Sequence, residues 1–353
     1  MRPILAIAAL LVVPAYAPAA RAQGPAGAAR DTACAADFAA MESAVRGGYP
    51  GLPGMTQARR AEFEALTRGV REEAGRASDG AACMATLQRW VVWFGDNHMQ
   101  LGESRPAQAA PPAQADDDRP SLSIADDSTA VLRLPSFGRD YKQAVDSLVA
   151  ANRARLLATP FLVIDVRGNG GGWTAVYDSV IPFLYTGPIR QDGMDVYASP
   201  ANIALAREMV SSGRAPAAML EQARAVLTRM EANPGGFVTF AEDTQIRLDT
   251  VYPLPRAVAL LVDRRCASSC EQFILDARQS RKVTVIGTGN TRGMLDYGNL
   301  RRVPLPSGQR RFFMPTARSR RLPANSMDRT GIAPAVLVPP GADPLVFAIQ
   351  HLH

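Results

Sequence analysis

Residues 257–273, AVALLVDRRCASSCEQF, pass from an apolar run through small residues into a helical pattern. The run Ala257 to Val262 predicts a strand buried on both faces, because it is short, continuous and rich in Val and Leu. Ala267, Ser268 and Ser269 place short side chains where the following helix has unpaired backbone N–H groups, which favour negative charge. Ser268 or Ser269 is therefore either a helix cap, the usual role of a serine before a helix, or a residue with chemistry to perform.

The first 22 residues have the pattern of a signal peptide. Arg2 precedes an apolar run from Ile4 to Val13, and Ala20-Arg21-Ala22 forms a small-residue cleavage pattern before Gln23. The apolar run is too short to cross a bilayer as a folded helix, and no later segment does better. We therefore expect an exported, soluble protein without stable membrane insertion, periplasmic in a Gram-negative source.

The composition is that of a globular protein, because 47% of the 353 residues are hydrophobic and 20% are charged, which argues against disorder. The formal charge of +6 is spread along the chain. Its densest basic cluster, Arg318, Arg320 and Arg321, contains no aromatic residue, which indicates a solvated surface. Nucleic acid is therefore not an expected partner, and export argues the same way.

Four cysteines in an exported chain permit two disulfides. Cys34 and Cys83 flank a helical region that a bridge between them would staple. Cys266 and Cys270 lie four apart around Ser268, and they either bridge the turn or stay as small buried thiols, since spacing alone does not settle their geometry.

Three parts are expected after the signal peptide: an N-terminal helical module at 23–103, a linker at 104–120 and a core domain at 121–353. The linker is rich in Pro, Ala and Asp and contains no core-forming residues. In the core, strands alternate with helices, which predicts parallel crossover units. Two helical segments at about 200–233 interrupt this alternation as an insertion over one side of the sheet, suited to act as a lid.

The expected elements follow from apolar periodicity and from turn residues. Helices are predicted at 35–45, 57–74, 80–94, 141–157, 174–185, 203–211, 217–232 and 344–352, and strands at 128–134, 161–166, 244–250, 257–262, 282–286 and 332–338, with a hairpin at 300–315.

Residues 161–173, FLVIDVRGNGGGW, lead from a buried strand into a glycine-rich turn. Glycines let backbone N–H groups approach a ligand or a reacting atom closely. The spacing GNGGG differs from the dinucleotide fingerprint G-x-G-x-x-G, and a nucleotide cofactor is not expected outside the cytoplasm. The turn is therefore either a tight connection only or a source of backbone donors.

His98, in the sequence Asp96-Asn97-His98, is the sole histidine outside the C-terminal tail, where His351 and His353 lie. It follows an amphipathic helix and sits among polar residues. An enzyme that needs a neutral base near pH 7 would find no other imidazole in this chain. The same scarcity of histidines argues against a zinc site, and no metal is expected.

Five motifs occur in a fixed order: DNH, VIDVRGNGGG, ASSCEQF, VIGTGNTRGMLDYGN, and Asp328-x-x-Gly331-Ile332-x-Pro334. In this order they resemble the tail-specific or C-terminal-processing serine peptidase family, whose catalytic core is shared with tricorn protease. The resemblance covers most of the mature chain. It implies an α/β fold with a βαβ core of the crotonase/ClpP-like kind, carrying the helical module and the helical insertion.

The resemblance also assigns roles at the serine turn. The nucleophile of the family is the serine of an S-x-x-E pattern, which is Ser268 ahead of Glu271. The backbone N–H of Ser269 would be one oxyanion donor, and Gly170 the other, with Gly171 as the fallback. Glu271 is interpreted as a helix residue that fixes the turn rather than as an acid catalyst.

The sequence departs from the branch of this family that uses a lysine base. Gly293 occupies the region where that lysine would stand, and the chain has only two lysines, Lys142 and Lys282. Lys282 heads a predicted strand after a full helix, so it is expected at the far end of the sheet from Ser268. A PDZ domain, common in that branch, is also not expected, because only a short linker separates His98 from the core.

With the lysine base excluded, the residues of this chain resemble the tricorn-type triad, in which His98 would be the base and an acid would orient its ring. The acid of the family lies just before a G-[IV]-x-P turn, which is the position of Asp328. Asp96, two residues before His98, and Asp296 are the rival candidates. An acid usually follows the proline of this motif, but Ala335 stands there instead.

From these residues we predict an exported serine-type endopeptidase that hydrolyses peptide bonds through a Ser268 acyl-enzyme, with His98 as general base and no metal or organic cofactor. Peptides or proteins are the expected substrates, and the oligomeric state stays open. The alternatives are a non-catalytic protein that binds peptides or hydrophobic ligands on the same scaffold, and an esterase-like hydrolase.

Overall fold

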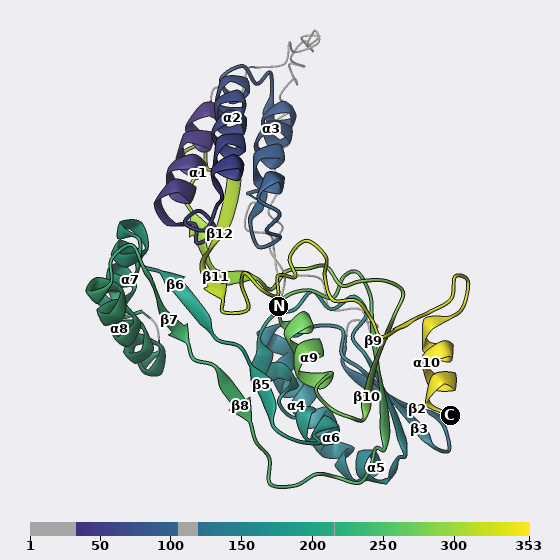
Figure 1. The fold of residues 1–353 in the computed structure, drawn as a ribbon. Coiled ribbons are helices and arrows are strands. Elements are labelled where there is room, and N and C mark those ends of the chain that lie inside the picture. The colour runs from purple at the N-terminus through teal and green to yellow at the C-terminus, as the bar shows by residue number, and fades with distance from the viewer. Residues whose placement is uncertain (1–32, 105–118, 215) are drawn as a thin grey trace, which may run out of the picture.

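The structure is a computed structural model that describes residues 33–104, 119–214 and 216–353. The predicted signal peptide and most of the predicted linker lie outside the described residues. Three helices form one end of the molecule, a helical hairpin lies beside them, and an α/β core forms the opposite end, as Figure 1 shows.

A six-stranded sheet forms the centre of the core. Its strands follow the order β13-β10-β9-β4-β3-β2, and all neighbouring strands are parallel except the β2–β3 pair. They are β2 (Ser121–Asp126), β3 (Thr129–Arg133), β4 (Phe161–Asp165), β9 (Ala257–Val262), β10 (Val283–Gly287) and β13 (Val336–Leu337). The fold is therefore the α/β class that the resemblance implies.

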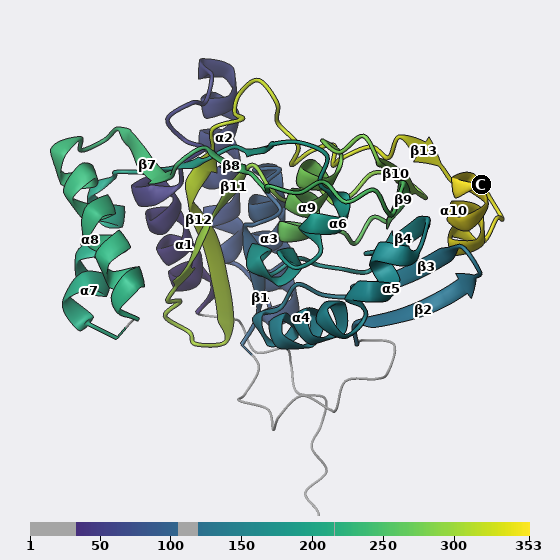
Figure 2. The same cartoon turned by 90° about the horizontal axis from the view of Figure 1, so that it is seen from below.

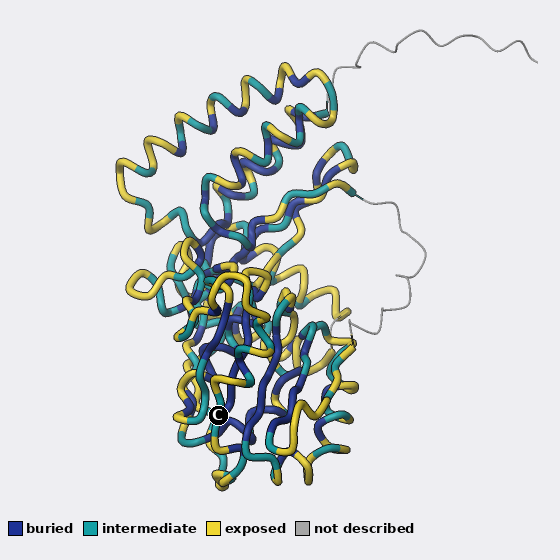
Figure 3. Tube along the Cα trace, turned by 90° about the vertical axis from the view of Figure 1, so that its right-hand side faces the viewer, coloured by how far each residue is buried: buried dark blue, intermediate teal, exposed yellow. Residues whose placement is uncertain are grey.

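Alternate residues of the central strands supply two apolar layers, as the period of two in a strand requires. Ile164 and Leu260 face helices α4 (Lys142–Ala151), α5 (Arg153–Ala158), α6 (Ile181–Leu184) and α9 (Ser269–Ala277). Val163 and Ala259 face α10 (Pro344–Leu352) on the other side of the sheet. Figure 2 shows α10 at the opposite end of the molecule from the hairpin α7–α8, and Figure 3 shows the buried strands running through the core. β9 is thus buried on both faces, as the sequence predicts.

The helical module consists of α1 (Cys34–Gly48), α2 (Gln57–Ala74) and α3 (Gly80–Trp93). A disulfide joins Cys34 to Cys83, and Trp90 packs edge-on against Phe38 at a centroid distance of 5.2 Å. Phe312, from a strand more than two hundred residues later in the chain, belongs to the same apolar cluster. The hydrophobic core of the module is therefore completed by the C-terminal half of the chain.

That strand is part of a second sheet, which joins the module to the rest of the molecule. The sheet contains β1 (Gln100–Glu103), β12 (Arg310–Ser319), β6 (Met194–Tyr197) and β7 (Phe237–Ala241) in this order, and β11 (Tyr297–Val303) pairs with β12. The helical hairpin α7 (Pro200–Ser212) and α8 (Ala217–Ala232) packs on it, because Val196 and Val238 share an apolar cluster with Val226 and Met230. A separate pair of strands is formed by β5 (Ile189–Gln191) and β8 (Thr244–Ile246).

Several predicted elements are wrong in extent. The helix expected at 174–185 is a 3-10 turn, η3 (Thr174–Tyr177), followed by the single turn of α6. The helix expected at 141–157 is preceded by a 3-10 turn, η2 (Arg139–Tyr141), and splits at Asn152 into α4 and α5. The strand expected at 244–250 ends at Ile246. Of the second sheet only the hairpin expected at 300–315 was predicted, and it is the β11–β12 pair. The other pairings join strands far apart in the sequence and leave no local periodic signal.

Candidate active site

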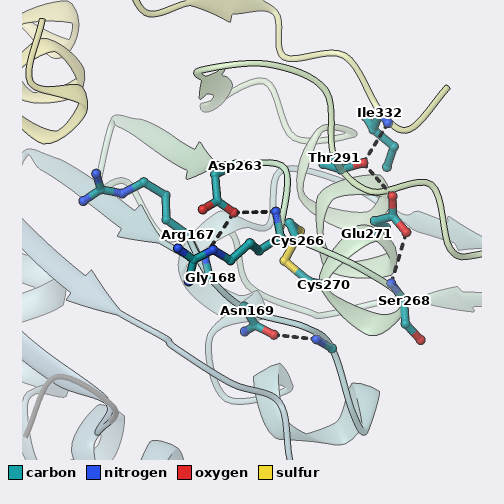
Figure 4. The surroundings of a disulfide bond; sticks show 12 residues. Arg167, Gly168, Asn169, Asp263, Cys266, Ser268, Cys270, Glu271, Thr291 and Ile332 are labelled. Atoms are coloured by element: carbon teal, nitrogen blue, oxygen red, sulfur yellow. Dashed lines mark hydrogen bonds between the residues drawn. A yellow bond between two sulfur atoms is a disulfide. The ribbon is translucent and has the colours of Figure 1, made fainter. Parts of the chain in front are cut away.

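Ser268 lies between β9 and α9, at the turn that the sequence predicts. Its backbone has φ 55° and ψ −120°, a conformation that a residue with a side chain rarely adopts. The N–H of Ser268 donates to a carboxylate oxygen of Glu271 at 3.0 Å. A disulfide between Cys266 and Cys270 closes a loop around Ser268, and both cysteines are fully buried. Figure 4 shows the bridge and this hydrogen bond beside the serine.

His98 reaches the serine from the other part of the molecule. It follows α3, and its Nε2 lies 3.4 Å from Ser268 Oγ. Burial, reinforced by the charge of Arg292, lowers the pKa of His98 to about 4, although the backbone of Tyr297 acts in the opposite direction. The ring is therefore neutral near pH 7 and can accept a proton from the serine hydroxyl.

Glu271 anchors the serine turn to the segment that follows β10. Its side chain is fully buried and accepts hydrogen bonds from four groups: Ser268 N–H, the Thr291 hydroxyl, Gly293 N–H and Met294 N–H. Both carboxylate oxygens are thus occupied by donors from the serine turn and from the segment after β10. These contacts are those of a residue that fixes the turn.

The glycine turn after β4 comes into direct contact with the serine turn. A Cβ atom at Gly171, where φ is +91°, would lie 2.4 Å from the Ala267 carbonyl oxygen and 3.0 Å from the Ser269 nitrogen. Only glycine allows this approach. The N–H of Gly171 already donates to Asn169 Oδ1 at 2.9 Å.

Two other N–H groups beside the serine remain without an acceptor in the described part of the chain, those of Gly170 and Ser269. Ser269 is the first residue of α9, where the N–H groups of a helix have no partner within it. Gly170 is exposed. Of the three candidate oxyanion donors, Gly170 and Ser269 thus have available N–H groups, whereas that of Gly171 is occupied.

Three aspartates lie buried in the same region: Asp96, Asp296 and Asp328. Asp328 accepts from the N–H groups of Leu295 and Asp296, both at 2.7 Å. Asp96 accepts from the backbone N–H of His98 at 2.8 Å. Asp296 accepts from the Ser326 hydroxyl and from two N–H groups, including that of Asp328.

Each of these aspartates also has a buried oxygen without a well-aligned hydrogen-bond donor among the described residues, and His98 Nδ1 likewise lacks a well-aligned partner. The Tyr49 side chain lies close enough to Asp96, and the Tyr297 backbone close enough to His98, to shift the pKa values of these groups. Burial raises the pKa of Asp328 to about 8 and that of Asp96 to about 7, and for Asp328 the charge of Asp96 acts in the same direction. The structure therefore brings all three candidate acids close together. Within the described residues, none of them hydrogen-bonds the imidazole ring.

Asn97 is a positioning residue that the sequence reasoning missed. Its side-chain amide donates to the carbonyl oxygens of Gly293 at 2.7 Å and Asp328 at 3.3 Å. It thereby fastens the loop of His98 to the segment that Glu271 and Asp328 hold. Its position inside the DNH motif, directly before His98, is the signal that could have identified it.

The two lysines lie in other contacts. Lys282 directly precedes β10, and the pairing of Val283 with Val258 sets it level with the start of β9, whereas Ser268 follows the end of that strand. Its ammonium donates to the Tyr252 carbonyl oxygen, and Lys142 pairs with Asp146. At Gly293 a Cβ atom would lie 2.5 Å from the Met327 carbonyl oxygen, so a lysine does not fit there.

No group of three or more His, Cys, Asp or Glu side chains within 33–104, 119–214 and 216–353 is arranged to hold a metal ion. The same ranges contain no helix that is long and apolar enough to cross a membrane.

Comparison with solved structures finds similar folds over most of the chain. A candidate peptidase from Parabacteroides merdae is 15% identical with a TM-score of 0.56, and the match covers 91% of this chain and 97% of that one. A lipoprotein from Streptococcus agalactiae is 13% identical with a TM-score of 0.50, covering 91% and 96%. These likenesses show a shared fold. No curated protein matches the chain.

The sequence also matches the model of peptidase family S41 over residues 128–338, which is more than half of the chain. The matched range contains the glycine turn, Ser268 and Asp328, whereas His98 precedes it. The match confirms the resemblance to the tail-specific serine peptidases. The chain belongs to peptidase family S41.

Proposed function

We propose that this protein is an exported serine-type endopeptidase with Ser268 as nucleophile and His98 as general base. Family membership supports a peptidase, and the observation that supports this mechanism is the 3.4 Å approach of His98 Nε2 to Ser268 Oγ. Two disulfides support export, because such bonds persist in oxidising compartments.

In the proposed reaction, Ser268 Oγ attacks the carbonyl carbon of the scissile peptide bond while its proton passes to His98 Nε2. The negative charge that develops on the carbonyl oxygen is stabilised by the N–H groups of Gly170 and Ser269, each contributing roughly 3 kcal/mol in comparable sites. His98 then protonates the leaving amine. A water molecule, deprotonated by His98, hydrolyses the acyl-enzyme and restores the serine.

Asp328 is proposed as the acid that orients His98 and stabilises the imidazolium. Its free oxygen and His98 Nδ1 are both buried and unpartnered in the described structure. Its other oxygen is held by two backbone N–H groups, which fixes the carboxyl group in place. Asp96 uses its bonded oxygen to hold the backbone of His98, which is a role in shaping the loop.

Hydrolysis of an unfolded protein tests this proposal. Purified wild-type protein should release new N-termini from reduced, alkylated casein, and Ser268→Ala protein of equal thermal stability should not. Cleavage by both proteins would contradict the assignment of Ser268. Cleavage of a small acyl ester but not of casein by the wild type would favour the esterase alternative.

A further inference from the structure

A hollow of about 470 Å³ lies between the helical hairpin α7–α8 and the face of the second sheet. Its walls are mainly apolar and include Met219, Val226 and Met230 of α8, Phe240 of β7 and Leu300 of β11. This volume is in the range of sites that bind small ligands or side chains. The hairpin therefore does not close fully onto the sheet.

Apolar side chains are left open to solvent around this hollow. Leu205, Met209, Met219 and Leu300 all line it, and each is between 36% and 43% exposed. Exposed apolar side chains gathered at one place on a soluble protein indicate a binding site. Methionine, with its flexible thioether chain, adapts to apolar groups of different shapes.

The hollow carries positive charge without an acidic counterpart. Arg139 and Arg301 line it, no aspartate or glutamate does, and neither arginine forms an ion pair within the described residues. Arg301 donates to the Ala44 carbonyl oxygen, but its Nε is buried without an acceptor. Asn202, which is only 4% exposed, also lines the hollow and has an unpartnered amide oxygen. A ligand that fits this wall has an apolar body and an anionic group.

Arg139 connects the hollow to the candidate active site. Its guanidinium lies over the ring of Trp173, 4.9 Å from the centroid. Trp173 directly follows the glycine turn, its N–H donates to the Phe137 carbonyl oxygen, and the N–H of Phe137 donates to the Gly171 carbonyl oxygen. The segment that carries Arg139 is therefore hydrogen-bonded to the turn that lies against Ser268.

We propose that this hollow is a substrate subsite, which takes a large apolar side chain of the peptide while Arg139 and Arg301 bind a carboxylate of the same peptide. The inference rests on the proposed peptidase function. It names the substrate class as peptides in which a large apolar residue lies near a carboxylate, either an acidic side chain or the chain terminus.

Binding to Ser268→Ala protein tests the subsite without turnover. Three fluorescent hexapeptides with two adjacent leucines are compared by anisotropy: one with a glutamate after the leucines and an amidated end, one with glutamine there and an amidated end, and one with glutamine and a free terminal carboxylate. We expect at least one of the carboxylate peptides to bind about 10-fold more tightly than the neutral one. Whichever of the two does so identifies the source of the carboxylate.

Two further substitutions, made in the Ser268→Ala protein, separate the contribution of charge to peptide binding from that of apolar contact. Arg139→Gln should remove the preference for the carboxylate, and Met219→Asn, which removes apolar surface without adding charge, should weaken binding of all three peptides by about 10-fold. Arg302→Gln is the matched control, because this exposed arginine lies next to Arg301 in β11 but outside the hollow, and it should change nothing. Both substituted positions are exposed, so each variant is expected to fold. If Met219→Asn does not fold, the comparison of Arg139→Gln with Arg302→Gln still tests the proposal.

Equal affinity for charged and neutral peptides, or equal effects of Arg139→Gln and Arg302→Gln, would overturn the proposal. Binding of laurate in the hollow without binding of any of the peptides would also overturn it, in favour of a fatty-acid site. Labelling of the wild-type serine by a small fluorophosphonate tests the peptidase function separately. A labelled enzyme whose Ser268→Ala form binds no peptide contradicts the subsite alone.

Discussion

His98 Nε2 lies 3.4 Å from Ser268 Oγ, although the two residues are 170 positions apart and belong to different parts of the molecule. The serine is fixed by the strand, turn and helix of the core. The histidine is delivered by the helical module, whose own apolar core includes residues of β12. Catalysis in this account depends on the docking of these two parts.

Asn97 is expected to maintain this docking. Asn97→Ala removes the donor to the carbonyl oxygens of Gly293 and Asp328, and we predict a kcat lower by roughly 10- to 100-fold with little change in KM, because small misplacements of a catalytic group have large effects. Steady-state kinetics on a peptide substrate measures both constants. An unchanged kcat would show that the module docks without this residue.

Glu271 is expected to contribute to stability as well as to catalysis. Glu271→Ala leaves four donors without their acceptor, and each buried unpaired donor costs about 1–3 kcal/mol. We predict a free energy of unfolding lower by at least about 3 kcal/mol in urea titrations. Glu271→Gln, which keeps one acceptor oxygen, should lose less. A loss no greater in the alanine variant than in the glutamine variant would contradict this role.

The pH dependence of activity separates the possible roles of Asp328. If its ionised form orients His98, kcat/KM rises with pH through about 8, the pKa to which burial raises this carboxyl group. If only a neutral His98 is needed, the rise lies near pH 4 instead. We predict the rise near pH 8, its loss in Asp328→Asn, and activity lower by roughly 100-fold or more in that variant.

The raised pKa of Asp328 also predicts that the free energy of unfolding changes with pH. A carboxyl group whose pKa is higher in the folded state than in the unfolded state holds its proton more tightly when folded. The stability that Asp328 contributes is therefore complete below about pH 4 and is lost as pH rises to about 8. The pKa of His98 is lowered in the folded state, so the stability that His98 contributes increases as pH rises from about 4 to 6.5. Urea titrations of Asp328→Asn and wild type across this range should show a pH-dependent difference, and a constant difference would contradict the assignment.

The two disulfides are expected to differ in effect. Cys266 and Cys270 are four residues apart, so their bridge restricts the unfolded chain little, whereas Cys34 and Cys83 are 49 apart. Replacing Cys266 and Cys270 by serine should lower kcat about 10-fold through the turn that holds Ser268. Replacing Cys34 and Cys83 should mainly lower the unfolding midpoint, measured by circular dichroism. Equal effects of both pairs on kcat would contradict a specific role at the turn.

Much of the core could be predicted from local sequence, because a doubly buried strand followed by small residues located the turn of Ser268. The scarcity of histidines pointed to His98 as a candidate base. The roles of Ser268, Gly170 and Asp328, in contrast, came from the resemblance to a known family, since local pattern alone allows Ser268 to be only a helix cap.

Beyond the hairpin of β11 and β12, the second sheet could not be predicted, since the pairing of Gln100 with Phe313 spans more than two hundred residues. Spacing also does not specify whether Gly170 or Gly171 is the oxyanion donor. That choice depends on the direction of the Gly171 N–H group, which donates to Asn169 Oδ1 in the structure.

Covalent labelling tests the central claim, that Ser268 is a nucleophile activated by His98, most directly. Mature protein is treated with a fluorophosphonate and the adduct is located by mass spectrometry. We predict an adduct on Ser268, none in Ser268→Ala or His98→Ala, and an unchanged rate in Lys282→Ala, whose ammonium is bound to the Tyr252 carbonyl oxygen. A folded wild-type protein that stays unlabelled, or labelling that survives in His98→Ala and is lost in Lys282→Ala, would contradict the account.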